Sequence, residues 1–229
     1  MDACYISSHS GIDDLIDKSL ISVSENKITM HDLLQQMGRD IFRSESPSEP
    51  GRRSRMWIPE DIYDVLIENS GTKTLKGMQL DMSRIPELEI KAEAFVKIRK
   101  LQFLKFYGTI SKIFFPQGLL SLPDELRYLC WKGYPLKTLP TRFDPKNPVE
   151  LDMGCSRVEL LWEGKQDLVN LKVISLVDST NLVRIPDLSS ATNLEFINFS
   201  NCTKLLELPS SLQHLEKLTR SNSRLCKNL

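Results

Sequence analysis

The stretch LKVISLVDSTNLVRIPDLSSATNLEFINFSNC, residues 171–202, carries one arrangement of apolar residues twice. Both copies follow the pattern L-x-x-L-x-L, with apolar positions at Leu171, Ile174 and Leu176 and then at Leu194, Ile197 and Phe199. The last two positions of each copy are two residues apart, and alternate side chains of a β-strand point to the same face. The pattern therefore predicts a short strand with one buried face, followed by a return segment.

The same pattern recurs upstream, and its spacing predicts the architecture. Copies begin at residues 75, 101, 126, 148, 171 and 194, which are 26, 25, 22, 23 and 23 residues apart. This spacing is typical of leucine-rich repeats, in which neighbours must stack because one repeat cannot bury its own apolar face. We therefore predict an α/β fold. Residues 73–229 should form a leucine-rich-repeat solenoid of about six to seven repeats, with a parallel β-sheet on its concave face.

The last copy of the pattern is degenerate. It places Ser221 and Ser223 at positions that are apolar in the other copies. Burying two hydroxyl groups without partners would cost roughly 1–3 kcal/mol each, so we expect a frayed C-terminal strand. Cys202 and Cys226 follow their strands at a position that is Asn or Cys in such repeats. We expect inert, buried thiols there, facing loop carbonyl groups.

Residues 1–72 predict a second unit, the C-terminal part of a winged-helix domain. The expected elements are a helix from Ile12, a β-hairpin around residues 25–27, an amphipathic helix after His31 and Asp32, a polar loop at 44–55 and a helix from Pro59 to near Gly71. The helices are predicted from apolar residues at helical spacing. The hairpin is predicted from alternating apolar and polar residues on either side of a polar turn.

The amino-acid composition argues against several classes of protein. The 30 basic and 30 acidic residues cancel, which argues against a general binder of nucleic acid or membrane surfaces. Residues 1–70 hold 7 basic and 13 acidic residues, whereas residues 71–229 hold the remaining 23 and 17, as expected for two units of opposite charge. The five cysteines form no C-x-x-C pair, and no signal peptide or membrane span is evident. We expect a soluble protein in the cytoplasm, or also the nucleus.

Several long strings resemble one known family. ITMHDLLQQMGRDI (28–41) and GRRSRMW (51–57) resemble the end of the nucleotide-binding switch module of plant intracellular immune receptors of the TIR–nucleotide-binding–leucine-rich-repeat family. LRYLCWKGYPLKTLP (126–140) resembles the repeats of that family. The resemblance covers nearly the whole chain. It implies a fragment of a disease resistance protein, with the end of the switch joined to part of the repeats.

The resemblance also implies a nucleotide contact. In that family a P-loop domain holds ADP at rest and ATP when active, and the motif matched here by Met30, His31 and Asp32 supplies a histidine to the ADP β-phosphate. A neutral imidazole N–H can donate to a phosphate oxygen at a helix N-terminus, and Asp32 would hold the local geometry as a helix cap. Because no G-x-x-x-x-G-K-[ST] motif is present, we expect neither ADP nor ATP to bind this chain tightly.

Two motifs have further interpretations. His31 and Asp32 side by side could be a catalytic pair, but the spacings indicate no nucleophile with an oriented base. We therefore expect no enzymatic activity; the TIR domain of the family, which can cleave NAD, would precede this chain. The segment GRRSR, residues 51–55, is a candidate nucleic-acid or nuclear-import patch, and we favour a solvated loop between two helices.

Solvent-facing strand positions on the concave face form a column. It consists of Phe103, Tyr128, Glu150, Val173 and Phe196. Several aromatics on one open surface are typical of a partner-binding patch. Alternatively, this face packs against the winged-helix unit, whose opposite charge favours such a contact. Both interpretations stay open.

Together these features predict a fragment of a receptor of plant innate immunity that acts by protein–protein interaction in sensing and autoinhibition. The expected partners are a protein ligand (a pathogen effector or a host protein that the receptor guards) and the receptor's own nucleotide-binding domain, with no nucleic acid and no membrane. The alternative is a stand-alone leucine-rich-repeat adaptor that binds one protein ligand without nucleotide switching.

Overall fold

The computed structural model describes residues 9–24, 27–108, 112–144 and 147–226. Its helices are α1 (His9–Asp17), α2 (Asp32–Ser44) and α3 (Pro59–Glu68), with 3-10 turns η1 (Pro50–Arg52), η2 (Met82–Arg84) and η3 (Ser210–His214). Its strands are β1 (Ile21–Ser24), β2 (Lys27–Met30), β3 (Arg55–Met56), β4 (Gly77–Asp81), β5 (Leu88–Glu89), β6 (Phe103–Tyr107), β7 (Ile113–Phe114), β8 (Tyr128–Trp131), β9 (Glu150–Asp152), β10 (Val173–Ser175), β11 (Phe196–Asn198) and β12 (Arg220–Asn222).

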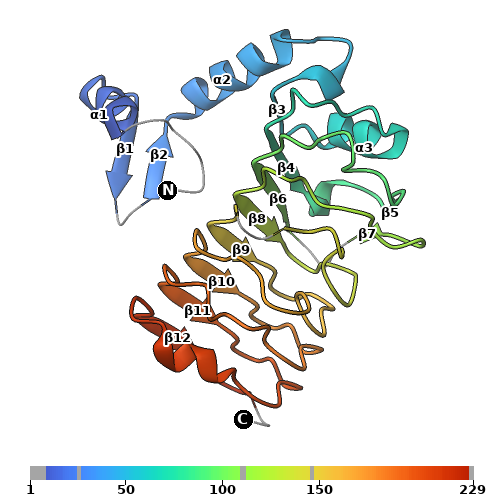
Figure 1. Cartoon of the computed structure of the whole chain (residues 1–229). Helices are drawn as coiled ribbons and strands as arrows, with labels where there is room; N and C mark the ends of the chain where they lie inside the picture. The colour runs from blue at the N-terminus through green and yellow to red at the C-terminus, as the bar shows by residue number, and fades with distance from the viewer. Residues whose placement is uncertain (1–8, 25–26, 109–111, 145–146, 227–229) are drawn as a thin grey trace.

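The largest element is an eight-stranded sheet in the order β12-β11-β10-β9-β8-β6-β4-β3. Every neighbouring pair in it is parallel. Figure 1 shows these strands stacked as a ladder, with the return segments on the opposite side. Within this sheet, each strand from β4 to β11 begins two residues after the first position of a repeat predicted from the sequence, whereas β5 and β7 form a separate two-stranded sheet. The predicted α/β fold with a large parallel sheet is confirmed, and the repeated strands are consistent with the predicted solenoid.

The apolar positions of the repeats form a continuous core. Successive strands place Leu104, Leu129, Leu151, Ile174 and Ile197 in register, and each exposes at most 1% of its surface. Burying a side chain of this size stabilises a fold by roughly 1.5–3 kcal/mol. Each repeat contributes one strand and one layer of the core. The stack is therefore stable only when neighbouring repeats are folded together.

The core is most aromatic around β8. Trp131 meets the rings of Phe95, Phe106, Phe115 and Tyr134, with ring centroids 4.7 to 6.0 Å apart. Three of these four pairs are edge-to-face, and such pairs add roughly 0.5–1.5 kcal/mol each beyond their buried area. This cluster joins the return segments of two repeats to the sheet.

The sheet and its core begin earlier than the predicted boundary after residue 72. β3 pairs with β4 through Arg55 and Gly77, and α3 buries Ile62, Val65 and Leu66 in the same core. The sequence prediction therefore assigned β3 and α3, which contribute to this sheet and core, to the N-terminal unit; the boundary between the two units stays a prediction. The physical reason is that a two-residue strand carries no periodicity, while a helix shows an apolar face without showing which partner it covers.

The C-terminal strand corrects a second expectation. β12 is not frayed: it pairs in parallel with β11, matching Ser221 to Ile197. Ser221 and Ser223 are exposed rather than buried, so their hydroxyl groups cause no desolvation penalty. The expected orientation of the thiols is confirmed, because Cys202 donates to the carbonyl of Leu176 at 3.1 Å and Cys226 to that of Phe199 at 3.2 Å. Cys202 is buried as expected, but Cys226 is only half-buried.

The N-terminal elements form a small separate unit. β1 and β2 make the predicted antiparallel hairpin, with Ile21 opposite Met30, and α1 and α2 flank it. In Figure 1, α2 connects the hairpin to the first strands of the solenoid. Within the described residues, no helix is long and apolar enough to cross a membrane.

Candidate functional site

His31 is the N-cap of α2. Its backbone is extended, with φ −60° and ψ 139°, and its Nδ1 accepts a hydrogen bond from the backbone N–H of Leu33 at 3.2 Å. Its carbonyl accepts from the N–H groups of Leu34 and Gln35. Because Nδ1 is the acceptor, a neutral imidazole carries its proton on Nε2. The exposed ring therefore keeps one N–H that can donate to a ligand.

Asp32 is not the cap that the sequence predicted. It is already the first residue of α2, and both Asp32 and His31 are exposed. The ring nitrogen of His31 accepts a hydrogen bond from the second N–H group of the helix. It therefore takes the capping role that was expected of the Asp32 carboxylate. A carboxylate in the first turn still interacts favourably with the positive end of the helix dipole. The side chain of Gln35 connects α2 to β2 by donating to the carbonyl of Met30 at 2.8 Å.

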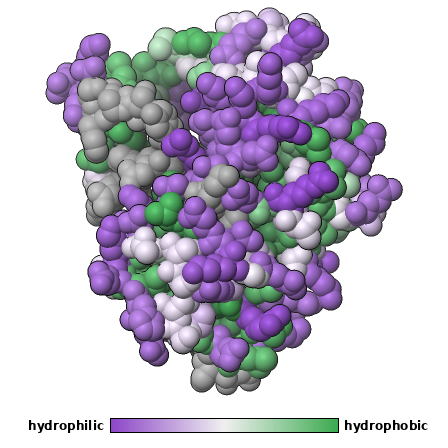
Figure 2. Space-filling model, viewed as in Figure 1, coloured by the Kyte–Doolittle hydropathy of each residue, from purple (hydrophilic) through white to green (hydrophobic). Residues whose placement is uncertain are grey.

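The apolar stripe predicted on α2 exists, but most of it is exposed. Leu33, Met37 and Ile41 expose 73%, 55% and 56% of their surface, and Figure 2 shows hydrophobic atoms over this helix. Phe42, by contrast, meets Trp57 edge-on with ring centroids 5.5 Å apart, and the Arg55 guanidinium lies 5.6 Å from the Phe42 ring centroid. The helix is therefore attached to the solenoid through its C-terminal end.

The segment from Glu45 to Arg55 is not the freely solvated loop that the sequence favoured. Arg53 exposes only 3% of its surface. Its guanidinium pairs with Asp61 of α3 and donates to the carbonyls of Ser46 at 2.8 Å and Pro47 at 3.1 Å. We call this group the Arg53 clamp. It ties the segment that follows α2 to the first helix of the solenoid.

A second group of bonds holds the same segment. The Glu45 carboxylate accepts from the Ser54 N–H at 2.6 Å and from the Ser54 hydroxyl at 2.8 Å. The carbonyl of Gly51 accepts from the N–H of Thr72 at 3.0 Å. A Cβ at Gly51 would lie 2.4 Å from the carbonyl oxygen of Ser70, so this close approach requires glycine. The connection between α2 and the solenoid is consequently well ordered.

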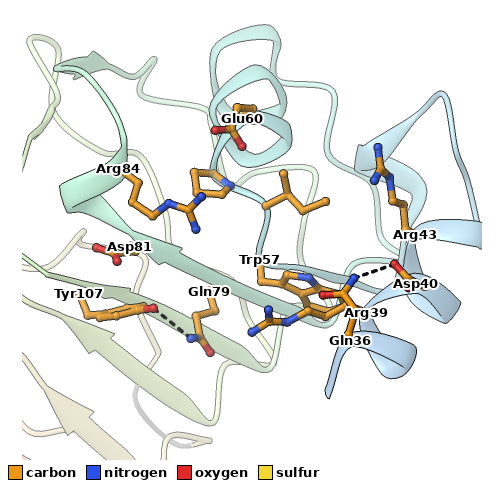
Figure 3. Close-up of a pocket in the computed structure, with 12 residues that line it drawn as sticks. Gln36, Arg39, Asp40, Arg43, Trp57, Glu60, Gln79, Asp81, Arg84 and Tyr107 are labelled. Carbon is orange, nitrogen blue, oxygen red and sulfur yellow. Dashed lines mark hydrogen bonds between the residues drawn. The ribbon is translucent and has the colours of Figure 1, made fainter. Parts of the chain in front are cut away.

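A pocket of about 230 Å³ lies where α2 meets the solenoid. Its lining comes from α2, from the residues between β3 and α3, from the start of α3, and from β4, β6 and η2 (Figure 3). Three guanidinium and three carboxylate groups line it: Arg39, Arg43, Arg84, Asp40, Glu60 and Asp81. Hydrogen bonds from the hydroxyl and N–H of Ser83 lower the pKa of Asp81. Because α2 forms one wall, the shape of this pocket depends on where the helix lies.

The predicted concave column exists in the expected register. Phe103, Tyr128, Glu150, Val173 and Phe196 are direct neighbours on successive strands. All five are half-buried. Phe103 and Tyr128 stack with ring centroids 4.6 Å apart and an interplanar angle of 8°.

The column has different chemistry at its centre and its end. At the C-terminal end, the Arg220 guanidinium lies 5.2 Å from the Phe196 ring centroid. At the centre, Glu150 and Asp152 lie on one face of β9, because alternate residues of a strand share a face. Asp152 accepts a bond from Lys132 Nζ at 2.6 Å. Within the described part of the chain, the Glu150 carboxylate makes no hydrogen bond or ion pair.

Burial raises the pKa of Glu150, and the charge of Asp152 raises it further, against the opposing effects of Lys105 and Lys132. Burial likewise raises the pKa of Cys130 to about 11, and Asp152 contributes to the same shift. The centre of the concave face therefore disfavours added negative charge. A cation placed there would relieve this repulsion.

Known proteins resemble both parts of the chain. Residues 1–46 match the model of a winged-helix domain described as Disease resistance protein Roq1-like. The chain is 44% identical to Disease resistance protein RPP2A of Arabidopsis thaliana, in a match that covers 100% of the chain and 18% of that protein. Disease resistance proteins RPS6 and TAO1 of the same plant are 43% and 40% identical, over 91% and 90% of the chain and 19% and 18% of their own lengths.

The homologues of this chain are plant disease resistance proteins. The chain spans about a fifth of the length of the curated relatives that it matches. In this chain, the motif residues His31 and Asp32 lie together at the start of α2, whereas the concave column lies on the solenoid sheet. Their roles in binding stay predictions.

Sequence reasoning missed the Arg53 clamp and the pocket beside α2. Two signals bore on the clamp: an arginine run between two predicted helices, and an acid near the start of the second helix. Neither signal identifies which arginine is buried, because burial depends on how α2 and α3 are arranged in space.

Proposed function

We propose that this chain is the part of a plant immune receptor that connects recognition of a protein partner to a nucleotide switch. The supporting observation is a match, 44% identical, that covers the whole chain and so includes both the N-terminal unit and the repeats. The repeats would contact the partner, and the N-terminal unit would sense or restrain the nucleotide state. The proposed location is the cytoplasm, or also the nucleus.

The proposed nucleotide contact is His31. Its Nε2–H is left to donate once Nδ1 caps α2, and the helix N-terminus favours an anion nearby. In the intact receptor, the β-phosphate of ADP would accept this hydrogen bond. One exposed histidine supplies too little binding energy to hold a nucleotide, so we expect this chain alone to bind ADP with a Kd weaker than about 1 μM, which corresponds to roughly −8 kcal/mol.

The connection between the two units supports a role in relaying this state. The Arg53 clamp and the Glu45–Ser54 bonds hold the end of α2 against the first elements of the solenoid. A displacement of the solenoid would therefore move α2, and His31 at its other end, as one body.

The test is a graft of this segment into an intact receptor, with two substitutions at one position. His31→Ala removes both the cap and the Nε2–H donor, whereas His31→Ser keeps a strong N-cap and removes only the donor. Under our proposal both variants raise basal signalling in the absence of a pathogen. If only His31→Ala has an effect, His31 acts by stabilising the helix and not by contacting nucleotide.

The alternative is a stand-alone adaptor without a nucleotide switch, and the same graft separates the two. An adaptor would show unchanged basal signalling for both His31 variants while partner binding persists. We also propose that the chain is not an enzyme. Turnover of an ester or phosphate substrate that disappears in His31→Ala would contradict this.

A further inference from the structure

Among the five residues of the concave column, Glu150 is the one that carries a carboxylate. Glu150 lies between Tyr128 and Val173 on neighbouring strands. Strands of a sheet are roughly 4.8 Å apart, so the carboxylate has an aromatic ring on one side and a branched aliphatic side chain on the other. It is half-buried among them.

The described cations of this face are engaged elsewhere. Lys132 pairs with Asp152, and Lys105 Nζ lies 5.1 Å from the Tyr107 ring centroid. The guanidinium of Arg220 lies against Phe196. Consequently Asp152 has an ion-pair partner within the described part of the chain. Glu150 forms no ion pair there, although the charges of Lys105 and Lys132 lower its pKa.

We propose that Glu150 is the specificity-determining group of the concave face, and that it receives a lysine or arginine side chain of a protein partner. The cationic tip would meet the carboxylate while the aliphatic stem lies along Val173 and the ring of Tyr128. The stacked pair of Phe103 and Tyr128 offers a flat apolar surface to the residues beside that cation. This inference rests on the proposed function, because it needs the concave face to be the recognition surface.

Electrostatics supports this assignment. Burial and the neighbouring Asp152 raise the pKa of Glu150, which means that folding makes the charged form less favourable. When folding raises the pKa of an acid, the protonated acid stabilises the folded state. This stability is lost as the pH rises through the folded-state pKa. At neutral pH the carboxylate therefore lowers the stability of the free chain, and a partner cation would remove that disadvantage. A group that opposes folding yet favours binding is expected at a recognition site.

The experiment selects peptide ligands from a random library and compares their sequences. A phage library of random twelve-residue peptides is panned against the complete immobilised chain, and the best peptide is synthesised for calorimetry. We expect selected peptides to share a lysine or arginine next to an aliphatic or aromatic residue. Replacing that lysine by norleucine, or that arginine by citrulline, should weaken binding at least tenfold.

Two variants of the chain complete the test. Glu150→Gln should weaken the basic peptide at least tenfold, whereas Glu163→Gln, an exposed glutamate on a return segment, should leave its affinity unchanged. The thermal midpoint of Glu150→Gln at pH 7 should equal or exceed that of the parent chain, which shows that lost binding is not lost folding. Selected peptides without a basic residue, or equal binding to Glu150→Gln, would overturn the assignment.

The two proposals fail separately. If the peptide results hold while grafted His31 variants leave basal signalling unchanged, the concave site stands and the switch role is refuted. If the His31 variants act as expected while peptides ignore Glu150, the receptor role stands and this inference is wrong.

Discussion

Removing the arginine of the Arg53 clamp should destabilise the protein far more than removing its neighbour. The side chain of Arg53 exposes 4% of its surface, and that of its partner Asp61 exposes 24%. Breaking a buried ion pair by deleting one member typically costs 3–5 kcal/mol. Because Asp61 keeps some contact with water, Arg53→Ala should cost about 3 kcal/mol, near the lower end of that range.

Arg52 is the matched control. It pairs with Glu49, and these two side chains expose 64% and 58% of their surface. Exposed pairs contribute roughly 0–1 kcal/mol, so Arg52→Ala should change stability by less than about 1 kcal/mol. Arg53→Lys should fall between the two, because an ammonium keeps the charge but lacks the planar fork that reaches three acceptors.

The assay is urea unfolding followed by tryptophan fluorescence, with thermal unfolding as a second measure. For a chain of this size, a loss of about 3 kcal/mol lowers the midpoint by roughly 6–12 °C. A double-mutant cycle with Asp61→Ala should give a coupling of roughly 2–3 kcal/mol. If Arg53→Ala and Arg52→Ala differ by less than about 1 kcal/mol, the clamp has no energetic role and our reasoning is refuted.

Two further predictions concern close packing and thiol chemistry. Gly51→Ala should lower stability by roughly 1–3 kcal/mol in the same urea assay, because its Cβ would lie 2.4 Å from the backbone oxygen of Ser70; an unchanged midpoint would mean that the segment moves aside easily. In iodoacetamide labelling at pH 8 followed by mass spectrometry, the exposed Cys155 should react first among the four described cysteines. Cys130 and Cys202 should stay unmodified until urea unfolds the chain, because burial raises their pKa values to about 11 and about 12. Rapid labelling of Cys202 in the folded chain would contradict its buried thiol.

Periodicity accounts for what could be predicted about the concave face. Aliphatic residues recur at nearly constant spacing, so the sequence alone determined which positions face the core and which five form the concave column from Phe103 to Phe196. The sequence also identified the His31-Asp32 motif, because short motifs are visible without coordinates. It assigned the cap to the wrong member of that pair, since the choice depends on which side chain reaches a backbone N–H group.

Only the tertiary structure decided the features that depend on contacts between distant segments. The pairing of β3 with β4, the burial of Arg53 against α3 and the exposure of Leu33 on α2 follow from how elements are arranged, and no local pattern encodes them. The same holds for Glu150, which in the sequence is one glutamate among many. Its distinct environment arises because Tyr128 and Val173, more than twenty residues away on either side, are brought beside it by the parallel register. The spacing of residues along the sequence determines which side chains of a strand share a face. The burial and the electrostatic environment of a side chain depend on the residues of the neighbouring segments.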